Sequence, residues 1–226
     1  MQKIKVWDLP TRLFHWLLVV AMAGLFFTGL EGGGWIEWHG KIGLAVIGLV
    51  VFRIVWGFCG STYARFFQFF PTPKGILAYL KGQWHGEGHN PLGALSVFAL
   101  LTLSLLQAGT GLFTDDQIAF TGPFAKLIDS DLSVSITGIH KQLAWVLLAF
   151  VGLHVLSIVF YRVVQKHNLL TAMITGTRLS DAPSAQGGGI VAFLVALILA
   201  AAAVFGATGL WLPEPPPPPP VETPAW

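Results

Sequence analysis

Two histidines, His140 and His154, lie fourteen residues apart in a segment that is almost free of charged residues. An α-helix turns by about 100° per residue, so fourteen residues bring a side chain back to within about 40° of the same face. At about 1.5 Å per residue the two imidazoles are also roughly 21 Å apart along the helix axis. The spacing therefore predicts one helix that presents two imidazoles on one side, at two heights.

The composition indicates the medium in which this helix lies. Hydrophobic residues make up 54% of the 226 residues and charged residues only 11%, whereas soluble domains carry about 25% charged residues. The sequence therefore predicts an integral membrane protein, in which ionisable side chains inside the lipid layer are costly and mark functional sites. The net charge of +2 and the lack of a basic block predict no nucleic-acid partner. The only cysteine, Cys59, excludes an intrachain disulfide.

Five apolar segments each have close to the roughly 20 residues that a helix needs to cross a bilayer. These segments are 12–30, 39–57, 91–113, 138–161 and 190–212. Lysine and arginine precede the first segment and follow the second and the fourth, whereas most aspartates and glutamates lie in the opposite loops. Because cytoplasmic loops of membrane proteins are enriched in Lys and Arg, this pattern predicts a cytoplasmic N-terminus and a periplasmic C-terminus.

The topology assigns a height in the membrane to each intramembrane histidine. His39 and His140 share the outer level, while His15 and His154 share the level towards the cytoplasm. Two imidazoles from different helices at one level are the ligand set of a b-type haem, whereas zinc needs three or four ligands. We therefore predict two haem b groups whose iron is held by the pairs His15/His154 and His39/His140. Small residues on the same helices leave room for a flat macrocycle: Gly24, Gly43, Gly48 and Gly152.

Two cations are candidates for binding the haem propionates. Arg53 lies fourteen residues after His39, near the inner level, and a guanidinium binds a carboxylate through two bonds. Lys141 follows His140 at the outer boundary. Each also has a simpler interpretation: Arg53 would snorkel to the lipid headgroups, and Lys141 would be an ordinary interfacial lysine.

Segments outside the spans have predicted roles of their own. Residues 59–89 are rich in aromatic and basic side chains, which predicts an interfacial element that covers the inner haem and a quinone entrance, or else a plain membrane anchor. The loop 114–137 carries four aspartates and either steers a basic partner or caps the outer haem. Three further histidines are interpreted as solvated interfacial side chains, with a role near a quinone left open for His89: His85, His89 and His167.

Several motifs together resemble one family, the bacterial cytochrome b561 and nickel–iron hydrogenase cytochrome b subunits. They are VWDLPTRLFHW, HGKIG, GHNPLG, the IHK…LH spacing, and YRVVQKHNLLTAMITG after the fourth segment. The resemblance covers about residues 4–179 and implies a four-helix bundle with two haems, ligated by the same four histidines. We therefore expect an all-α integral membrane fold: a di-haem bundle over 1–179, a linker and fifth helix over 180–212, and an extended, disordered, periplasmic proline-rich tail over 213–226.

Iron with two histidine ligands has no open position for a substrate, so the predicted chemistry is the transfer of single electrons. The predicted function is electron transfer across a bacterial inner membrane, between quinone or quinol and a periplasmic or membrane-attached redox partner such as a c-type cytochrome or a hydrogenase-like subunit. The chain would then be a subunit of an oxidoreductase rather than a complete enzyme. Two alternatives stay open: a self-contained quinone oxidoreductase using a small reductant such as superoxide, and a haem-free transporter or anchor.

Overall fold

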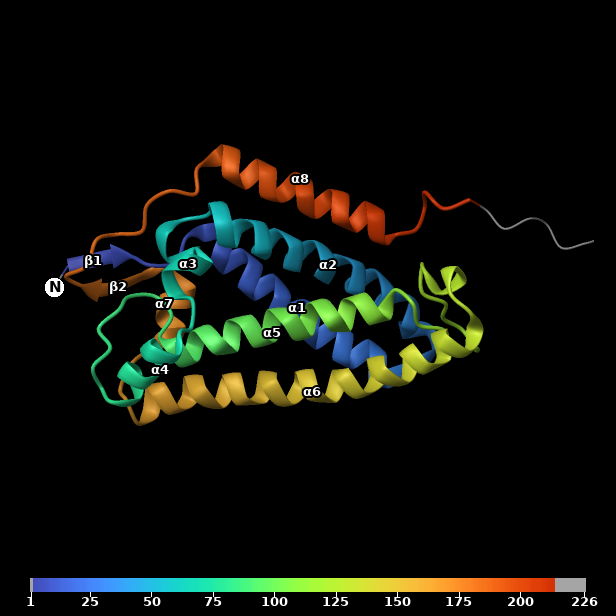
Figure 1. Cartoon of the computed structure of the whole chain (residues 1–226), viewed down its shortest axis with the longest axis horizontal. Coiled ribbons are helices and arrows are strands. Elements are labelled where there is room, and N and C mark those ends of the chain that lie inside the picture. The colour runs from blue at the N-terminus through green and yellow to red at the C-terminus, as the bar shows by residue number, and fades with distance from the viewer. Residues whose placement is uncertain (1, 214–226) are drawn as a thin grey trace, which may run out of the picture.

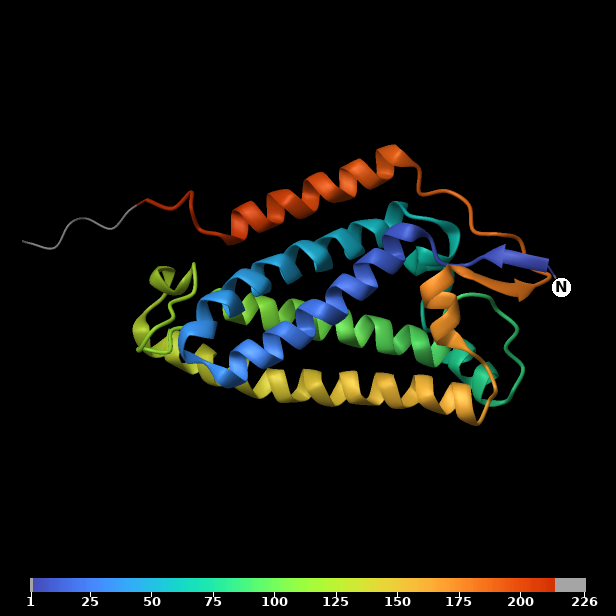
Figure 2. The ribbon, with the colours of Figure 1, turned by 180° about the vertical axis from the view of Figure 1, so that it is seen from behind.

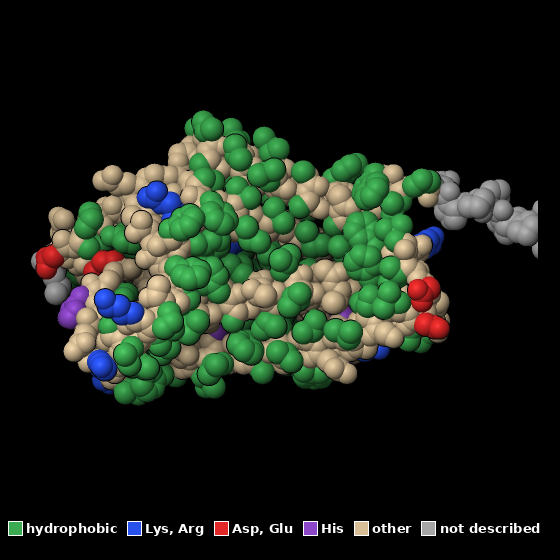
Figure 3. Space-filling view, viewed as in Figure 1, with side chains coloured by type: hydrophobic (Ala, Val, Ile, Leu, Met, Phe, Trp, Pro, Cys, Tyr) green, Lys and Arg blue, Asp and Glu red, His purple; other side chains and the backbone are tan. Residues whose placement is uncertain are grey.

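The computed structural model describes residues 2–213, and five long helices dominate it (Figure 1). Each of the five is long and apolar enough to cross a membrane: α1 (Leu9–Glu31), α2 (Ile36–Cys59), α5 (Pro91–Gly111), α6 (Ser130–Val163) and α8 (Ile190–Ala207). On the face drawn in Figure 3, hydrophobic side chains cover the middle of the molecule, and most charged side chains lie towards its two ends. The predicted all-α membrane fold is confirmed. The proline-rich tail, from residue 214 onward, lies outside the described residues.

Four of these helices form a bundle, and the fifth lies on its outside. Helix α2 packs against α1, α5 and α8, and α5 packs against α6. Both views show α8 beside α2, on the side of the molecule away from α6 (Figures 1 and 2). Gly48 of α2 makes this docking possible, because a Cβ atom at that position would lie 2.8 Å from Val204 Cγ2 of α8. The expectation that Gly48 admits a macrocycle is therefore wrong, since its open side is filled by α8.

The remaining elements gather at the two ends of the bundle. The end with the N-terminus, called the sheet end here, holds the antiparallel strands β1 (Gln2–Lys5) and β2 (Thr177–Ser180). The short helices at this end are η2 (Thr62–Ala64), α3 (Phe66–Phe69), α4 (Pro73–Leu80) and α7 (Leu169–Thr175). The opposite end, called the loop end, holds η1 (Gly33–Trp35) and the α5–α6 connection with η3 (Ala125–Leu127).

Helices at the sheet end begin at capping residues that the sequence places just before a proline. The Asp8 side chain accepts a hydrogen bond from the N–H of Thr11 at the start of α1, and Asn90 accepts one from Gly93 at the start of α5. A side-chain oxygen at this position satisfies a backbone N–H that has no partner in the helix, and proline is well suited to the first turn. These caps set where α1, which carries His15, and α5, which packs against α2 and α6, begin.

Helix α6 is longer than predicted. It begins at Ser130, whereas the apolar segment begins at 138, because Asp129 caps it and its polar first turns are helical although they are not apolar. With 34 residues, α6 is roughly 51 Å long and exceeds the hydrocarbon layer of about 30 Å. Its first turns therefore belong to the loop end and help to position the outer connection.

The apolar core lies between α1, α2 and α8 near the sheet end. Its largest fully buried side chain is Trp56, which is 1% exposed and packs against Phe14, Phe52 and Ala200. The indole Nε1 of Trp56 donates a hydrogen bond of 3.0 Å to Asp8 Oδ2. One side chain thus links the N-cap of α1 to α2 and α8.

Replacing Trp56 by phenylalanine is expected to lower the free energy of unfolding by about 1.5–3 kcal/mol, because the Asp8 carboxylate then loses a buried donor. Thermal unfolding in detergent, followed by circular dichroism, measures the effect. Trp145→Phe is the matched control, since Trp145 is 61% exposed on α6. Equal melting temperatures of the two variants would contradict the assigned role of this hydrogen bond.

Candidate functional site

Two histidine rings, from α2 and α6, lie close together near the loop end. The ring centroids of His39 and His140 are 6.2 Å apart, and the ring planes are at 81° to each other. A bond between a metal and an imidazole nitrogen is about 2 Å long and the ring centroid lies roughly 1 Å further, so two imidazoles on opposite sides of one ion have centroids about 6 Å apart. The observed spacing fits a single iron ion between the two rings.

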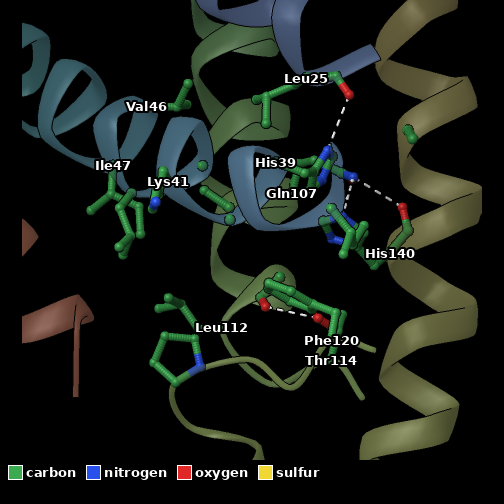
Figure 4. Close-up of a pocket in the computed structure, with 18 of the residues that line it drawn as sticks. Leu25, His39, Lys41, Val46, Ile47, Gln107, Leu112, Thr114, Phe120 and His140 are labelled. Atoms are coloured by element: carbon green, nitrogen blue, oxygen red, sulfur yellow. Dashed lines mark hydrogen bonds between the residues drawn. The ribbon is translucent and has the colours of Figure 1, made fainter. Parts of the chain in front are cut away.

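Hydrogen bonds orient the two rings and set their tautomers (Figure 4). His39 Nδ1 lies 3.1 Å from the carbonyl oxygen of Leu25, which only accepts, so Nδ1 carries the proton and Nε2 is free to ligate. His140 Nδ1 lies 3.1 Å from the Thr110 hydroxyl, and its Nε2 lies 3.1 Å from the amide nitrogen of Gln107. The amide donates, so Nε2 of His140 is the unprotonated nitrogen, and a metal at Nε2 would take the place of the Gln107 amide.

A cavity of about 380 Å³ adjoins this pair of histidines and is lined by α1, α2, α5, α6 and the α5–α6 connection. Most of the lining side chains are apolar, as a macrocycle with a hydrocarbon edge requires. A Cβ atom at Gly43, which lines the cavity, would meet nothing within 4 Å, so this glycine opens directly onto the free space. The residues present therefore fit a haem at the outer level.

Two further glycines, which the sequence interpretation missed, lie directly against the histidine rings. A Cβ atom at Gly29 of α1 would be 2.9 Å from His39 Cε1, and one at Gly111 of α5 would be 3.1 Å from His140 Cε1. Each histidine thus has a glycine from a neighbouring helix beside its ring. The sequence could have revealed these glycines, because Gly29 is at the height of His39 and Gly111 is at the height of His140.

The α5–α6 connection covers the cavity rather than projecting freely. Phe120, Thr121 and Pro123 line the cavity, and a Cβ atom at Gly40 would be 2.8 Å from the Phe120 ring. The backbone N–H groups of the segment 118–120 donate to Asp116 Oδ1 at 2.9 Å each. The bond from Phe120, together with the other two, holds the pKa of Asp116 below its ordinary value. Asp116 therefore shapes the turn that carries the Phe120 ring to the cavity.

The second pair of histidines lies nearer the sheet end, on α1 and α6. His154 Nδ1 lies 3.3 Å from the Ser96 hydroxyl of α5. His15 Nδ1 is buried and has no hydrogen-bond partner in the described residues. Across residues 2–213, no group of three or more His, Cys, Asp and Glu side chains converges as a multidentate metal site would. His39 and His140 are thus in ring contact between α2 and α6, while His15 and His154 lie on α1 and α6 nearer the sheet end.

Arg53 lies inside the bundle and not at the lipid surface. It is 2% exposed, its Nη2 donates 3.2 Å to the Ala64 carbonyl, and its guanidinium lies 4.7 Å above the Phe66 ring. The snorkelling interpretation of Arg53 is therefore wrong. Lys141 is exposed at the loop end, where its charge acts on Asp116 and His140.

The segment between α2 and α5 folds over the sheet end. A second cavity, of about 370 Å³, is lined there by aromatic and polar residues that include Phe69, Phe70, Trp84 and His89. The interpretation of His89 as a solvated side chain is wrong, because its Nδ1 is buried. Burial, followed by the charges of Arg53 and the inner histidines, lowers the pKa of His89 to about 3, so the ring is neutral at neutral pH.

A hydrogen-bonded group of side chains ties this segment to α6. Asn90 Nδ2 donates 2.9 Å to the Tyr161 hydroxyl, and the Tyr161 and Tyr79 hydroxyls are hydrogen-bonded to each other. Tyr161 lies seven residues after His154 on α6, so it is on the same face, two turns further along. The cover of the sheet end is thereby fixed to the helix that carries the inner histidine.

The comparisons with known proteins agree on one family. Residues 6–176 match the family model described as "Prokaryotic cytochrome b561". The sequence is 25% identical over 212 residues to the "Probable Ni/Fe-hydrogenase 1 B-type cytochrome subunit" of Escherichia coli K12, covering 76% of this chain and 89% of that protein. It is also 25% identical over 220 residues to a "Probable Ni/Fe-hydrogenase B-type cytochrome subunit" of Rhizobium leguminosarum, covering 79% and 90%. No solved structure matches the chain.

Proposed function

Because the chain belongs to the prokaryotic cytochrome b561 family and is a membrane b-type cytochrome, we propose that it binds two haem b groups and carries electrons between a quinone and a partner redox protein. His39 and His140 would hold the outer haem, and His15 and His154 the inner one. Haem b with two histidine ligands supplies one-electron redox chemistry and no open site for a substrate. The 6.2 Å separation of the His39 and His140 rings is the observation that carries the proposal.

Histidines at two heights would give electrons a path along the membrane normal. His140 and His154 are fourteen residues apart on α6, which separates the two levels by roughly 21 Å along that helix. Arg53 and Lys141 would each serve a propionate, at the inner and outer level respectively. The apolar side chains around the outer pair exclude water from the ring, which tunes the potential of the iron.

The cavity at the sheet end is the proposed quinone site. Phe69, Phe70 and Trp84 offer flat apolar surfaces to a quinone ring, and the Gln68 amide in the same lining can donate a hydrogen bond to a quinone oxygen. Reduction of a quinone to a quinol takes two electrons and two protons, so the site must be near both the inner histidines and water. The positive-inside pattern of the sequence supports a cytoplasmic position for this end and a periplasmic position for the loop end in a bacterium.

The proposed redox partner binds at the loop end. The relatives whose names describe a role are subunits of nickel–iron hydrogenases, which favours a hydrogenase-like partner over a c-type cytochrome. The α5–α6 connection that covers the outer cavity would form part of this interface, and its aspartates would attract basic side chains. Electrons would then enter or leave through the outer haem.

The test uses the purified full-length protein in detergent. A reduced-minus-oxidised spectrum and a haem assay are expected to give two low-spin haems per chain, and a quinol analogue is expected to reduce them without any partner protein. A preparation that lacks a Soret band would overturn the cytochrome and favour a transporter or an anchor. Sustained turnover of quinol with a small oxidant or superoxide would favour a complete enzyme over a subunit.

A variant of the proposed quinone site sharpens this test. Replacing Phe70 by alanine is expected to raise the quinol concentration for half-maximal reduction roughly three- to tenfold, because a stacking surface is lost. Phe67→Ala is the matched control, since Phe67 is 76% exposed in the same segment and does not line the cavity. Dithionite should reduce both variants fully. Equal quinol dependence in both would locate the quinone elsewhere.

A further inference from the structure

Several buried polar atoms at the sheet end lack partners, and two of them belong to Arg53 and His89. Nη1 of Arg53 and Nδ1 of His89 are buried and have no hydrogen bond in the described residues. A buried polar group that loses its partner costs about 1–3 kcal/mol, and a charged one costs more. Buried polar groups in native proteins are therefore almost always paired. This pair of atoms indicates a ligand that accepts hydrogen bonds and carries negative charge.

The carboxylates of Asp8 and Glu87 accept hydrogen bonds from other groups, and the charge of Asp8 also acts on Arg53. Asp8 accepts from the Thr11 N–H through Oδ1 and from Trp56 Nε1 through Oδ2. Glu87 accepts from the Ser180 hydroxyl and forms an ion pair of 3.1 Å with Arg178. The missing acceptor is therefore not supplied by either of these carboxylates.

The His89 ring packs against two aromatic side chains. The ring lies 4.6 Å from the Trp7 ring and 4.4 Å from the Phe69 ring, centroid to centroid. Arg53, His154 and His15 are all close enough for their electrostatic effect to reach His89. These two ring contacts restrict the rotation of the His89 side chain.

We propose that His89 and Arg53 together bind one carboxylate of the inner haem, with His89 as a positioning residue for that haem. The inference rests on the proposed haem at His15 and His154. One propionate oxygen would accept from Arg53 Nη1 and from His89 Nδ1, which satisfies both buried atoms with one charged group. The neutral imidazole donates one hydrogen bond and the guanidinium neutralises the carboxylate.

The experiment compares His89→Leu, which removes the donor, with His89→Gln, which keeps one, and with the exposed control His85→Gln. Loss of the donor leaves more negative charge on the propionate and favours the ferric iron. The inner haem of His89→Leu is therefore expected to be about tenfold harder to reduce, a shift of its midpoint potential by about −59 mV for one electron. His89→Gln is expected to recover part of this shift, and the outer haem is expected to keep its potential.

Haem with ¹³C-labelled propionates identifies the source of the carboxylate. In the reduced-minus-oxidised infrared spectrum, carboxylate bands that move with the label and change in His89→Leu support the inference. Bands that change in His89→Leu but do not move with the label assign the pair to a free carboxylate and overturn it. Two haems with unaltered potentials and unaltered bands in His89→Leu also overturn it, yet they leave the proposed function standing. Absence of the inner haem in the unmodified protein removes the proposed function itself.

Discussion

Replacing His15 or His154 by alanine is expected to remove the same haem, and replacing His39 or His140 is expected to remove the other. In each variant the haem content falls from about two to about one per chain, because iron with a single imidazole is held weakly and becomes accessible to solvent. The haem assay gives the stoichiometry. Low-temperature optical and electron paramagnetic resonance spectra show which of the two low-spin signals disappears.

The pattern of losses tests the pairing separately from the ligands. The double variant His39→Ala/His140→Ala is expected to keep one haem with the spectrum that remains in each single variant, because both changes act on one site. His167→Ala is the control, since His167 is exposed beyond the end of α6. If His15→Ala and His140→Ala removed the same haem, the four ligands would be right and the pairing wrong.

The arrangement of the spans follows largely from the sequence. The apolar segments predict all five long helices, because each run is close to the length of a bilayer crossing. Helix periodicity and chain direction predict that His39 and His140 lie at the same height. The 6.2 Å spacing of their rings agrees with this prediction. Local patterns are sufficient here since each helix satisfies its own backbone hydrogen bonds.

Features that depend on contacts between distant segments could not be predicted from the sequence. Gly48 has the same local signature as Gly43, yet one meets Val204 of α8 and the other opens onto the cavity. His89 lies in a polar, glycine-rich segment that predicts a solvated side chain, and its burial results from Trp7 and Phe69 packing around it. Periodicity gives the face of a helix and the height of a residue, but it does not say which neighbour fills the space.

Gly111→Leu is expected to remove most of the outer haem while leaving all four histidines intact. A Cβ atom at this position would lie 3.1 Å from His140 Cε1, so the larger side chain must displace the imidazole or itself. Overpacking of this kind costs about 1–3 kcal/mol, and a displaced imidazole also loses its bond to iron. The haem-to-protein ratio and the loss of the outer low-spin signal measure the effect.

The control lies on the same helix two residues earlier. Gly109 meets nothing within 4 Å of a Cβ atom and does not line the outer cavity, while Gly109→Leu brings the same gain in intrinsic helix propensity of about 1 kcal/mol. We expect Gly109→Leu to keep both haems. The inner haem serves as the internal reference in both variants, because α5 near Gly111 is remote from the sheet end. If Gly111→Leu retained the outer haem at its original potential, His140 would have to ligate from a position different from the one described.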